Sequence, residues 1–252
     1  MDILALFFLG VVQGLAEFFP ISSSGHLVLF SKIFGIQEAL FLSVILHVAT
    51  LLSIVVVMKK ELWQIIRHPL SKQSIFIALS TVPTCIIALA ILPLVKSSFG
   101  GQLLPICFMI SAILLLLSTK LSTKNVDNPL SIKSVLWMGI AQGFAVFPGV
   151  SRSGATICTG LFQGVEKIAV TKFSFLMSIP IILMSLVMEV YELFSNNLKI
   201  DISFVGMSVA FVVAFLLGIF AIKFMLKINQ SKYFKFFAIY LVFMAVLSLF
   251  VV

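Results

Sequence analysis

The sequence predicts an all-α integral membrane protein made of two inverted-topology repeats, each a re-entrant helical hairpin plus three transmembrane helices. Three observations lead to this fold class. The chain is 61% hydrophobic and only 10% charged, well below the roughly 25% charged residues of a soluble domain. Its mean hydropathy is +1.23, and its apolar runs approach the length of a bilayer-spanning helix. A polar motif near the N-terminus also recurs in the second half of the chain.

The two polar motifs define the repeat. The first is QGLAEFFPISSSGHLVL at 13–29, and the second is QGFAVFPGVSRSGAT at 142–156. They align without a gap at an offset of 129 residues (142 − 13 = 129), close to half of the 252-residue chain. Gln, Gly, Ala, Phe, Ser, Ser and Gly recur at matching positions. We therefore expect one polytopic membrane domain, 1–252, with repeat one at about 1–125 and repeat two at about 130–252.

Each motif interrupts an apolar segment. Pro20 and the serines after it break the first segment, which predicts half-helices at roughly 3–18 and 22–34, because proline removes a backbone donor and disfavours helix just before itself. Pro148-Gly149 breaks 135–165 in the same way. Non-helical backbone at membrane depth is tolerated only where it is buried in protein or faces water. A re-entrant hairpin in each half fits this better than two full crossings, which would give eight spans.

Six further apolar runs approach spanning length. They lie at about 40–58, 75–94, 102–119, 173–190, 203–222 and 236–252. Lysines concentrate in the loops after the first, third and fifth runs, which the positive-inside rule makes cytoplasmic, so the chain starts outside. Because each half has one hairpin and an odd number of spans, the second half is inverted. The two hairpins then enter from opposite faces and meet near the midplane, where such folds place a binding site.

Charge and cysteine content exclude other classes. The net charge of +8 comes from lysines between apolar runs, so we expect a lipid bilayer and no nucleic acid as partner. Cys85, Cys107 and Cys158 lie in apolar segments, without metal-binding spacing or a disulfide framework. The N-terminus lacks the features of a cleaved signal peptide. It carries the polar motif, so we expect it to be retained.

Glu17 is the acid inside the first polar segment. An intramembrane carboxylate is costly and is by default a functional candidate. Gln13 lies one helical turn earlier, on the same face. Together they could hold a hard cation, Mg²⁺ or Ca²⁺, which prefers oxygen ligands. The alternative for both residues is hydrogen bonding between helices.

Ser22, Ser23 and Ser24 stand at the start of a half-helix, where free backbone donors and the helix dipole favour a phosphate. Ordinary N-capping is the alternative. His26 follows Ser23 by three residues, so the two side chains can approach on one helix face. That spacing permits a base-assisted hydroxyl nucleophile, or a histidine acting as nucleophile or general acid. A hydrogen-bonded core histidine is the alternative.

Arg152, one of only two arginines, lies in the second broken segment. Its planar fork suits phosphate oxygens. Ser151, Ser153 and Thr156 add donors around it, at a second new helix N-terminus. An ion pair between Arg152 and Glu17 is the alternative, and an unliganded site could hold that pair.

Two histidines lie outside the motifs. His47 lies within an apolar run, where hydrogen bonding between helices is the favoured explanation, with a supporting role in the site left open. His68 lies in a basic loop, which accounts for it.

The two motifs, together with FSFLMSIP at 173–180, closely resemble the signatures of bacterial undecaprenyl-diphosphate phosphatases of the BacA type. The resemblance covers essentially the whole chain. It implies removal of the terminal phosphate from a C55 polyprenyl diphosphate, which recycles the lipid carrier of cell-wall synthesis and confers bacitracin resistance. It also implies a divalent metal, a plasma (inner) membrane location with the site open to the outer face, and interdigitated inverted repeats with two re-entrant hairpins.

The resemblance carries roles to particular residues. Gln13 and Glu17 match the (E/Q)xxxE element, where Gln13 replaces an acid found in some members and leaves the site one charge poorer. The expected catalytic residues are Ser23, His26, Glu17 and Arg152. The expected phosphate-binding residues are Ser22, Ser24, Ser151, Arg152, Ser153 and Thr156, and the expected metal ligands are Glu17 and Gln13. Whether Ser23 or His26 is the nucleophile stays open.

Two other classes of membrane protein were considered. The acid-phosphatase-like lipid phosphatases share the SGH element but need a further histidine downstream, and this chain has none after His68. A polyprenyl-phosphate transporter or flippase also fits, since inverted repeats with broken helices are common in transporters. The sequence does not decide between a monomer and a homodimer, nor fix the prenyl chain length or the metal.

Overall fold

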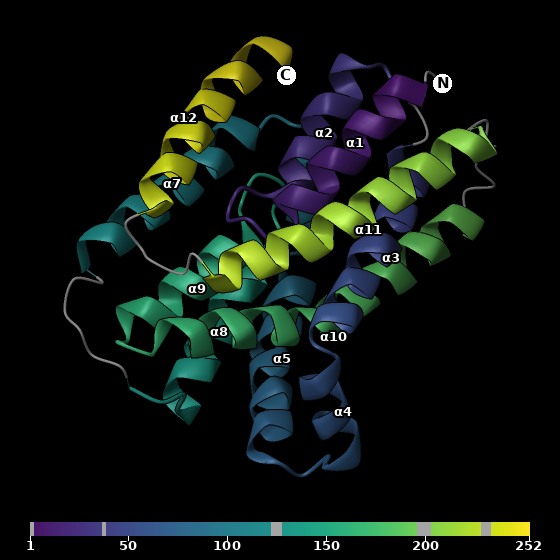
Figure 1. Ribbon diagram of the computed structural model, residues 1–252. Coiled ribbons are helices and arrows are strands. Elements are labelled where there is room, and N and C mark those ends of the chain that lie inside the picture. The colour runs from purple at the N-terminus through teal and green to yellow at the C-terminus, as the bar shows by residue number, and fades with distance from the viewer. Residues whose placement is uncertain (1–2, 37–38, 122–127, 196–202, 228–232) are drawn as a thin grey trace.

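The computed structural model is all-helical (Figure 1) and describes residues 3–36, 39–121, 128–195, 203–227 and 233–252. Within these ranges the helices are α1 (Ile3–Ala16), α2 (Ser23–Ile33), α3 (Ala39–Val57), α4 (Lys59–Arg67), α5 (Lys72–Ala90), α6 (Leu92–Ser98), α7 (Leu104–Leu121), α8 (Ile132–Phe144), α9 (Arg152–Phe162), α10 (Lys167–Ser195), α11 (Phe204–Lys227) and α12 (Phe234–Val251).

Five helices in the described ranges are long and apolar enough to cross a membrane: α3, α5, α10, α11 and α12. The remaining predicted run, 102–119, forms α7, whose apolar stretch Leu104–Lys120 is shorter than those five. Large apolar side chains cover the outer surface of the bundle; Ile239 and Phe250 of α12, for example, are 65% and 84% exposed. A surface of this kind suits lipid tails rather than water. The chain is therefore a multi-pass membrane protein.

The two predicted interruptions are confirmed. The chain leaves α1 at Ala16 and enters α2 at Ser23, and it leaves α8 at Phe144 and enters α9 at Arg152. Left-handed backbone occurs in both turns, at Ser22 with φ 69° and at Gly149 with φ 95°. A left-handed residue reverses the chain sharply, which is rare for any residue other than glycine.

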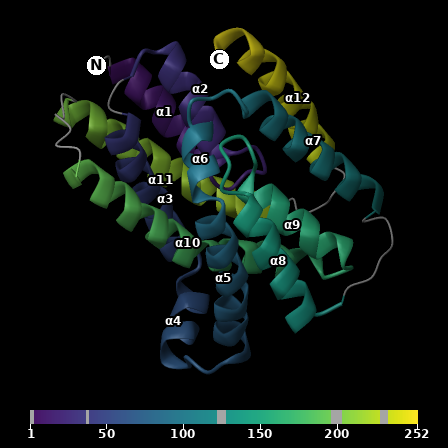
Figure 2. The same ribbon diagram turned by 180° about the vertical axis from the view of Figure 1, so that it is seen from behind.

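Helices of one half pack mainly on helices of the other (Figures 1 and 2). These pairs include α1 with α11, α8 with α5, α7 with α12, and α3 with α10; α3 also packs on α11. An offset of 129 residues relates α1 to α8 and α11 to α5, so the first two pairs are equivalent. The same offset relates α7 to α12 and α3 to α10, so each of these pairs maps onto itself. The two halves thus interleave instead of lying side by side.

Glycines allow the two equivalent contacts to be close. A Cβ at Gly10 of α1 would lie 2.6 Å from the carbonyl oxygen of Ala210 in α11. At Gly139 of α8, the matching position, a Cβ would lie 2.2 Å from the carbonyl oxygen of Ser80 in α5. Small residues at a helix interface let backbones approach, which is the usual basis of helix packing in lipid.

A helix stands where the sequence predicts a basic loop. None of the described residues of α4 is buried, and Figures 1 and 2 show α4 beside the end of α5, away from the rest of the bundle. Trp63 and Ile66 are exposed, and the Arg67 guanidinium lies 4.7 Å from the Trp63 ring centre. Apolar and basic side chains on one short helix are typical of a segment at the membrane surface.

Candidate functional site

The site forms where the two hairpin turns meet. A Cβ at Gly25, in the first turn of α2, would lie 2.6 Å from the Cα of Gly149. At Gly154, in the first turn of α9, a Cβ would lie 3.3 Å from the Cβ of Pro20. These two contacts are equivalent under the 129-residue offset. Each turn therefore packs against the start of the other half's second half-helix.

Two serines fix the starts of these half-helices. Ser22 caps α2 by accepting from the Gly25 N–H at 3.3 Å, and Ser151 caps α9 by accepting from the Gly154 N–H at 3.1 Å. The Ser22 hydroxyl also accepts from the Gly149 N–H at 3.1 Å, which ties the hairpins together. Capping, the alternative given for these serines, is thus present. Free N–H groups at a helix start favour an anion, so capping does not exclude the predicted phosphate role.

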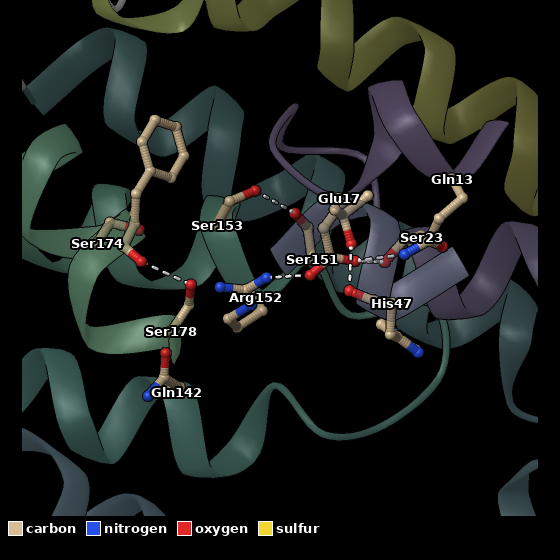
Figure 3. Close-up of polar contacts among 12 residues, drawn as sticks. Gln13, Glu17, Ser23, His47, Gln142, Ser151, Arg152, Ser153, Ser174 and Ser178 are labelled. Carbon is tan, nitrogen blue, oxygen red and sulfur yellow. Dashed lines mark hydrogen bonds and ion pairs between the residues drawn. The ribbon is translucent and has the colours of Figure 1, made fainter. Parts of the chain in front are cut away.

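Glu17 is the centre of the polar network (Figure 3). Its Oε2 atom accepts from the Gln13 Nε2 at 3.0 Å and from the Ser23 hydroxyl at 2.6 Å, while its Oε1 atom pairs with the Arg152 guanidinium. The side chains of Glu17 and Arg152 are only 4% and 15% exposed. The structure therefore brings the acid of the first half and the arginine of the second into direct contact. This ion pair was the alternative weighed for Arg152.

His26 does not join this network. Its Nδ1 lies 2.7 Å from the Ser22 carbonyl oxygen, and its Nε2 lies 2.7 Å from the hydroxyl of Tyr240 in α12. The two rings stack at 5.5 Å, and His26 is 1% exposed. The expected approach of Ser23 to His26 is not formed, because Ser23 faces Glu17 while the His26 ring faces α12. A catalytic role for His26 stays a prediction.

The donors predicted in the second motif separate into two groups. The Ser153 hydroxyl donates to the Phe19 carbonyl at 2.9 Å and lies 3.3 Å from the Ser151 hydroxyl, at the hairpin contact. Thr156 lies one turn further along α9, fully buried, with its hydroxyl 2.6 Å from that of Ser174 in α10. Thr156 thus contributes to packing between α9 and α10 and does not face the hairpin contact.

A cavity of about 530 Å³ opens beside the network. Its polar wall holds seven of the predicted site residues: Glu17, Ser22, Ser23, Ser24, Ser151, Arg152 and Ser153. Gln13, His26 and Thr156 do not line it. Its apolar wall comes from α3, α5, α6 and α10 and includes Leu42, Leu89, Leu92, Ile182 and Met188. A cavity with a charged end and an apolar wall suits a lipid with a polar head.

Sequence reasoning missed a second polar group on this cavity. Ser43 and His47 of α3 and Glu189 of α10 all line it. The sequence places Ser43 and His47 one turn apart, on one face of a span. Glu189 lies at the end of the predicted run, about 173–190, whereas α10 continues to Ser195. The sequence does show an acid near the end of one apolar run and a serine–histidine pair on one face of another. Polar residues inside spans are functional candidates, although the sequence does not show that these ones meet.

The network can be tested for its fit to a divalent metal. The buried Oε1 atom of Gln13 has no hydrogen-bond partner, and it belongs to the residue one turn from Glu17. No cluster of three or more His, Cys, Asp or Glu side chains suited to a metal occurs within the described ranges. Mg²⁺ commonly takes one or two carboxylates and completes its shell with substrate phosphates and water. The residues present fit a cation held partly by substrate.

Comparison with known proteins identifies the family of the chain. The model of the family described as "Bacitracin resistance protein BacA" matches residues 6–247. The chain is 37% identical over 237 residues to the undecaprenyl-diphosphatase of Carboxydothermus hydrogenoformans, covering 92% of this chain and 90% of the relative. It is 35% identical over 247 residues to the undecaprenyl-diphosphatase of Thermosipho melanesiensis, covering 95% and 96%. The chain therefore belongs to the BacA family.

Proposed function

We propose that this protein is an undecaprenyl-diphosphate phosphatase, which hydrolyses C55 polyprenyl diphosphate to the monophosphate and phosphate. The activity recycles the lipid carrier of cell-wall synthesis and confers bacitracin resistance. The observation that carries the proposal is one cavity that joins Glu17, Ser23 and Arg152 to an apolar wall. Membership of the BacA family and the names of the relatives support the substrate.

We further propose that the chain consists of two inverted repeats, each with a re-entrant hairpin, in the plasma membrane. The equivalent packing of α1 on α11 and of α8 on α5 supports this arrangement. So do the matched hairpin contacts at Gly25 and Gly154. With the lysine-rich loops in the cytoplasm, the chain starts outside. The site then opens to the outer face of the membrane.

The arrangement suggests how the substrate is held. Arg152 and the N–H groups at the starts of α2 and α9 would bind the terminal phosphate, because a guanidinium and helix N-termini both suit an anion. Arg152 pairs with Glu17 in the structure. Substrate therefore competes with Glu17 for the guanidinium, and its arrival frees carboxylate oxygen. The prenyl chain would lie along the apolar wall of the cavity.

The hydrogen bond from Ser23 to Glu17 supports Ser23 as the nucleophile. Its hydroxyl attacks the terminal phosphorus, forming a serine phosphate ester and breaking the bond to the bridging oxygen, so polyprenyl phosphate leaves. Glu17 accepts the serine proton, because its Oε2 atom already receives that hydrogen bond at 2.6 Å. Water then hydrolyses the ester and releases phosphate. Such chemistry depends mainly on positioning and charge stabilisation.

The remaining predicted residues take supporting roles. When bound, Mg²⁺ or Ca²⁺ would neutralise charge on the diphosphate, and Glu17 with the Oε1 atom of Gln13 would hold it. His26 would position the hairpin turn, since it links the Ser22 carbonyl to Tyr240.

One experiment tests the proposed function. Purified protein in detergent, with Mg²⁺, should release phosphate from C55 polyprenyl diphosphate, and a chelator should stop the reaction. In proteoliposomes, movement of polyprenyl phosphate between leaflets without any phosphate release would contradict the proposal and favour a transporter.

A further inference from the structure

A second polar group faces the cavity from α3 and α10, separate from the Glu17 network. The Ser43 hydroxyl donates to Glu189 Oε1 at 3.2 Å, and His47 Nδ1 lies 3.1 Å from the Ser43 oxygen. The same Nδ1 lies 3.5 Å from Glu189 Oε2, and the side chains of His47 and Glu189 are 15% and 20% exposed. The group is therefore partly buried, while all three residues line the cavity.

The hydrogen bonds show that Nδ1 of the His47 imidazole carries a hydrogen. Ser43 has one hydroxyl hydrogen, which it donates to Glu189. Toward His47 the Ser43 oxygen must then accept, so Nδ1 of His47 carries a hydrogen. The contacts that hold His47 in the described part of the chain, with Ser43 and with Glu189, both use Nδ1. Nε2, on the other side of the ring, is left for a ligand in the cavity.

Two basic side chains that line one cavity, Arg152 and His47, suit the two phosphates of a diphosphate. Three basic side chains line the cavity in the described ranges: Arg152, His47 and Lys96. Lys96 is 57% exposed and pairs with Glu192 at 3.4 Å, so it belongs to the mouth of the cavity. Arg152 and Glu17 line the same cavity as His47. The diphosphate head has two phosphates, and Arg152 accounts for only the terminal one.

We propose that Nε2 of His47, oriented by Ser43 and Glu189, binds the phosphate that stays on the lipid. This inference rests on the proposed phosphatase function and assigns its leaving-group subsite. Nε2 can donate to a phosphate only when the ring is an imidazolium with a hydrogen on both nitrogens. A carboxylate on one side and a phosphate on the other favour that charged form. Negative charge accumulates on the leaving phosphate as the bond to the bridging oxygen breaks, and a preplaced N–H donor stabilises it there. His47 then acts on both substrate binding and rate.

The test measures binding of the product lipid separately from turnover. Wild-type protein and the variants His47→Ala, His47→Gln and Glu189→Gln are titrated with undecaprenyl phosphate and, in parallel, with inorganic phosphate. We expect His47→Ala to weaken undecaprenyl phosphate binding roughly 10-fold or more and to lower kcat/KM roughly 10- to 100-fold, as for loss of a hydrogen bond to a charged group. Binding of inorganic phosphate should be unchanged. His47→Gln should retain part of the affinity for undecaprenyl phosphate. The affinity of Glu189→Gln should lie between those of His47→Gln and the wild type.

Two controls and two outcomes complete the design. His68→Ala and Glu61→Gln change the same residue types outside the cavity and should behave as wild type. If His47→Ala does not fold, His47→Gln and Glu189→Gln carry the comparison. Undecaprenyl phosphate binding unchanged in all three variants would overturn the inference, even if activity falls. Absence of phosphate release by the wild type would refute the phosphatase function instead, which the binding measurement distinguishes.

Discussion

The contact between Glu17 and Arg152 gives a prediction that requires no assay of activity. Each residue comes from a different half of the chain, and both are largely buried. Arg152→Gln should leave the Glu17 carboxylate, 4% exposed, without its counter-ion. Breaking a buried pair in this way costs about 3 kcal/mol, the lower end of the usual range. Glu17→Gln should cost less, roughly 2 kcal/mol, because Arg152 is 15% exposed and lines the cavity.

The double variant Glu17→Gln/Arg152→Gln removes both charges together. Its destabilisation should be about 2 kcal/mol smaller than the sum of the two single effects, since coupled neighbours are not additive. The free energy of unfolding of all four proteins is measured in mixed micelles by denaturant titration. Additive effects, within about 0.5 kcal/mol, would refute the contact between the two hairpins.

Three further predictions concern single residues of the network. Ser23→Ala should lower phosphate release by at least about 100-fold, whereas Ser208→Ala, on the exposed face of α11 and outside the cavity, should stay within a few-fold of wild type; equal rates for both would exclude Ser23 as nucleophile. Tyr240→Phe removes the hydroxyl that contacts His26 Nε2. It should lower the free energy of unfolding by about 1 kcal/mol and leave the affinity for inorganic phosphate intact. A loss of that affinity would place His26 at the phosphate. Gln13→Glu should lower the Mg²⁺ concentration needed for half-maximal activity, because it adds a carboxylate ligand; an unchanged metal titration would exclude Gln13 from the metal site.

The helix interruptions could be predicted because local chemistry determines them. Proline, glycine and serine mark the helix interruptions, and the duplicated motif places Ser22 and Ser151 at equivalent N-caps. The predicted starts of the second half-helices therefore lie close to those observed. The ion pair between Glu17 and Arg152 was the alternative to phosphate binding by Arg152, since few charged side chains lie at membrane depth and opposite charges there pair.

The roles of the histidines could not be predicted in the same way. The three-residue spacing of Ser23 and His26 places them near one another on a helix, but it does not reveal which neighbouring helix each one faces. Here Glu17 binds Ser23 and Tyr240 binds His26. The Ser23 and His26 side chains point in different directions because α12 packs on α2 and α7 and places Tyr240 beside His26.

The C-terminal end of α10 could not be predicted from hydropathy either. Hydropathy ended the run near the first acid, Glu189, because a charge is costly inside a span. In the folded protein that carboxylate meets Ser43 and His47 of α3, and the helix continues. The partner that offsets the cost lies 142 residues away in sequence (189 − 47 = 142). A one-dimensional pattern does not contain it.

The central claim is that one catalytic cavity is assembled from both halves of the chain, with the acid and serine from one and the arginine from the other. Its most direct measurement is the single-turnover rate of phosphate release from C55 polyprenyl diphosphate, compared among wild type, Glu17→Gln and Arg152→Ala with saturating enzyme. The account predicts that each variant is slower by at least about 100-fold. Release at the wild-type rate by either variant would contradict it.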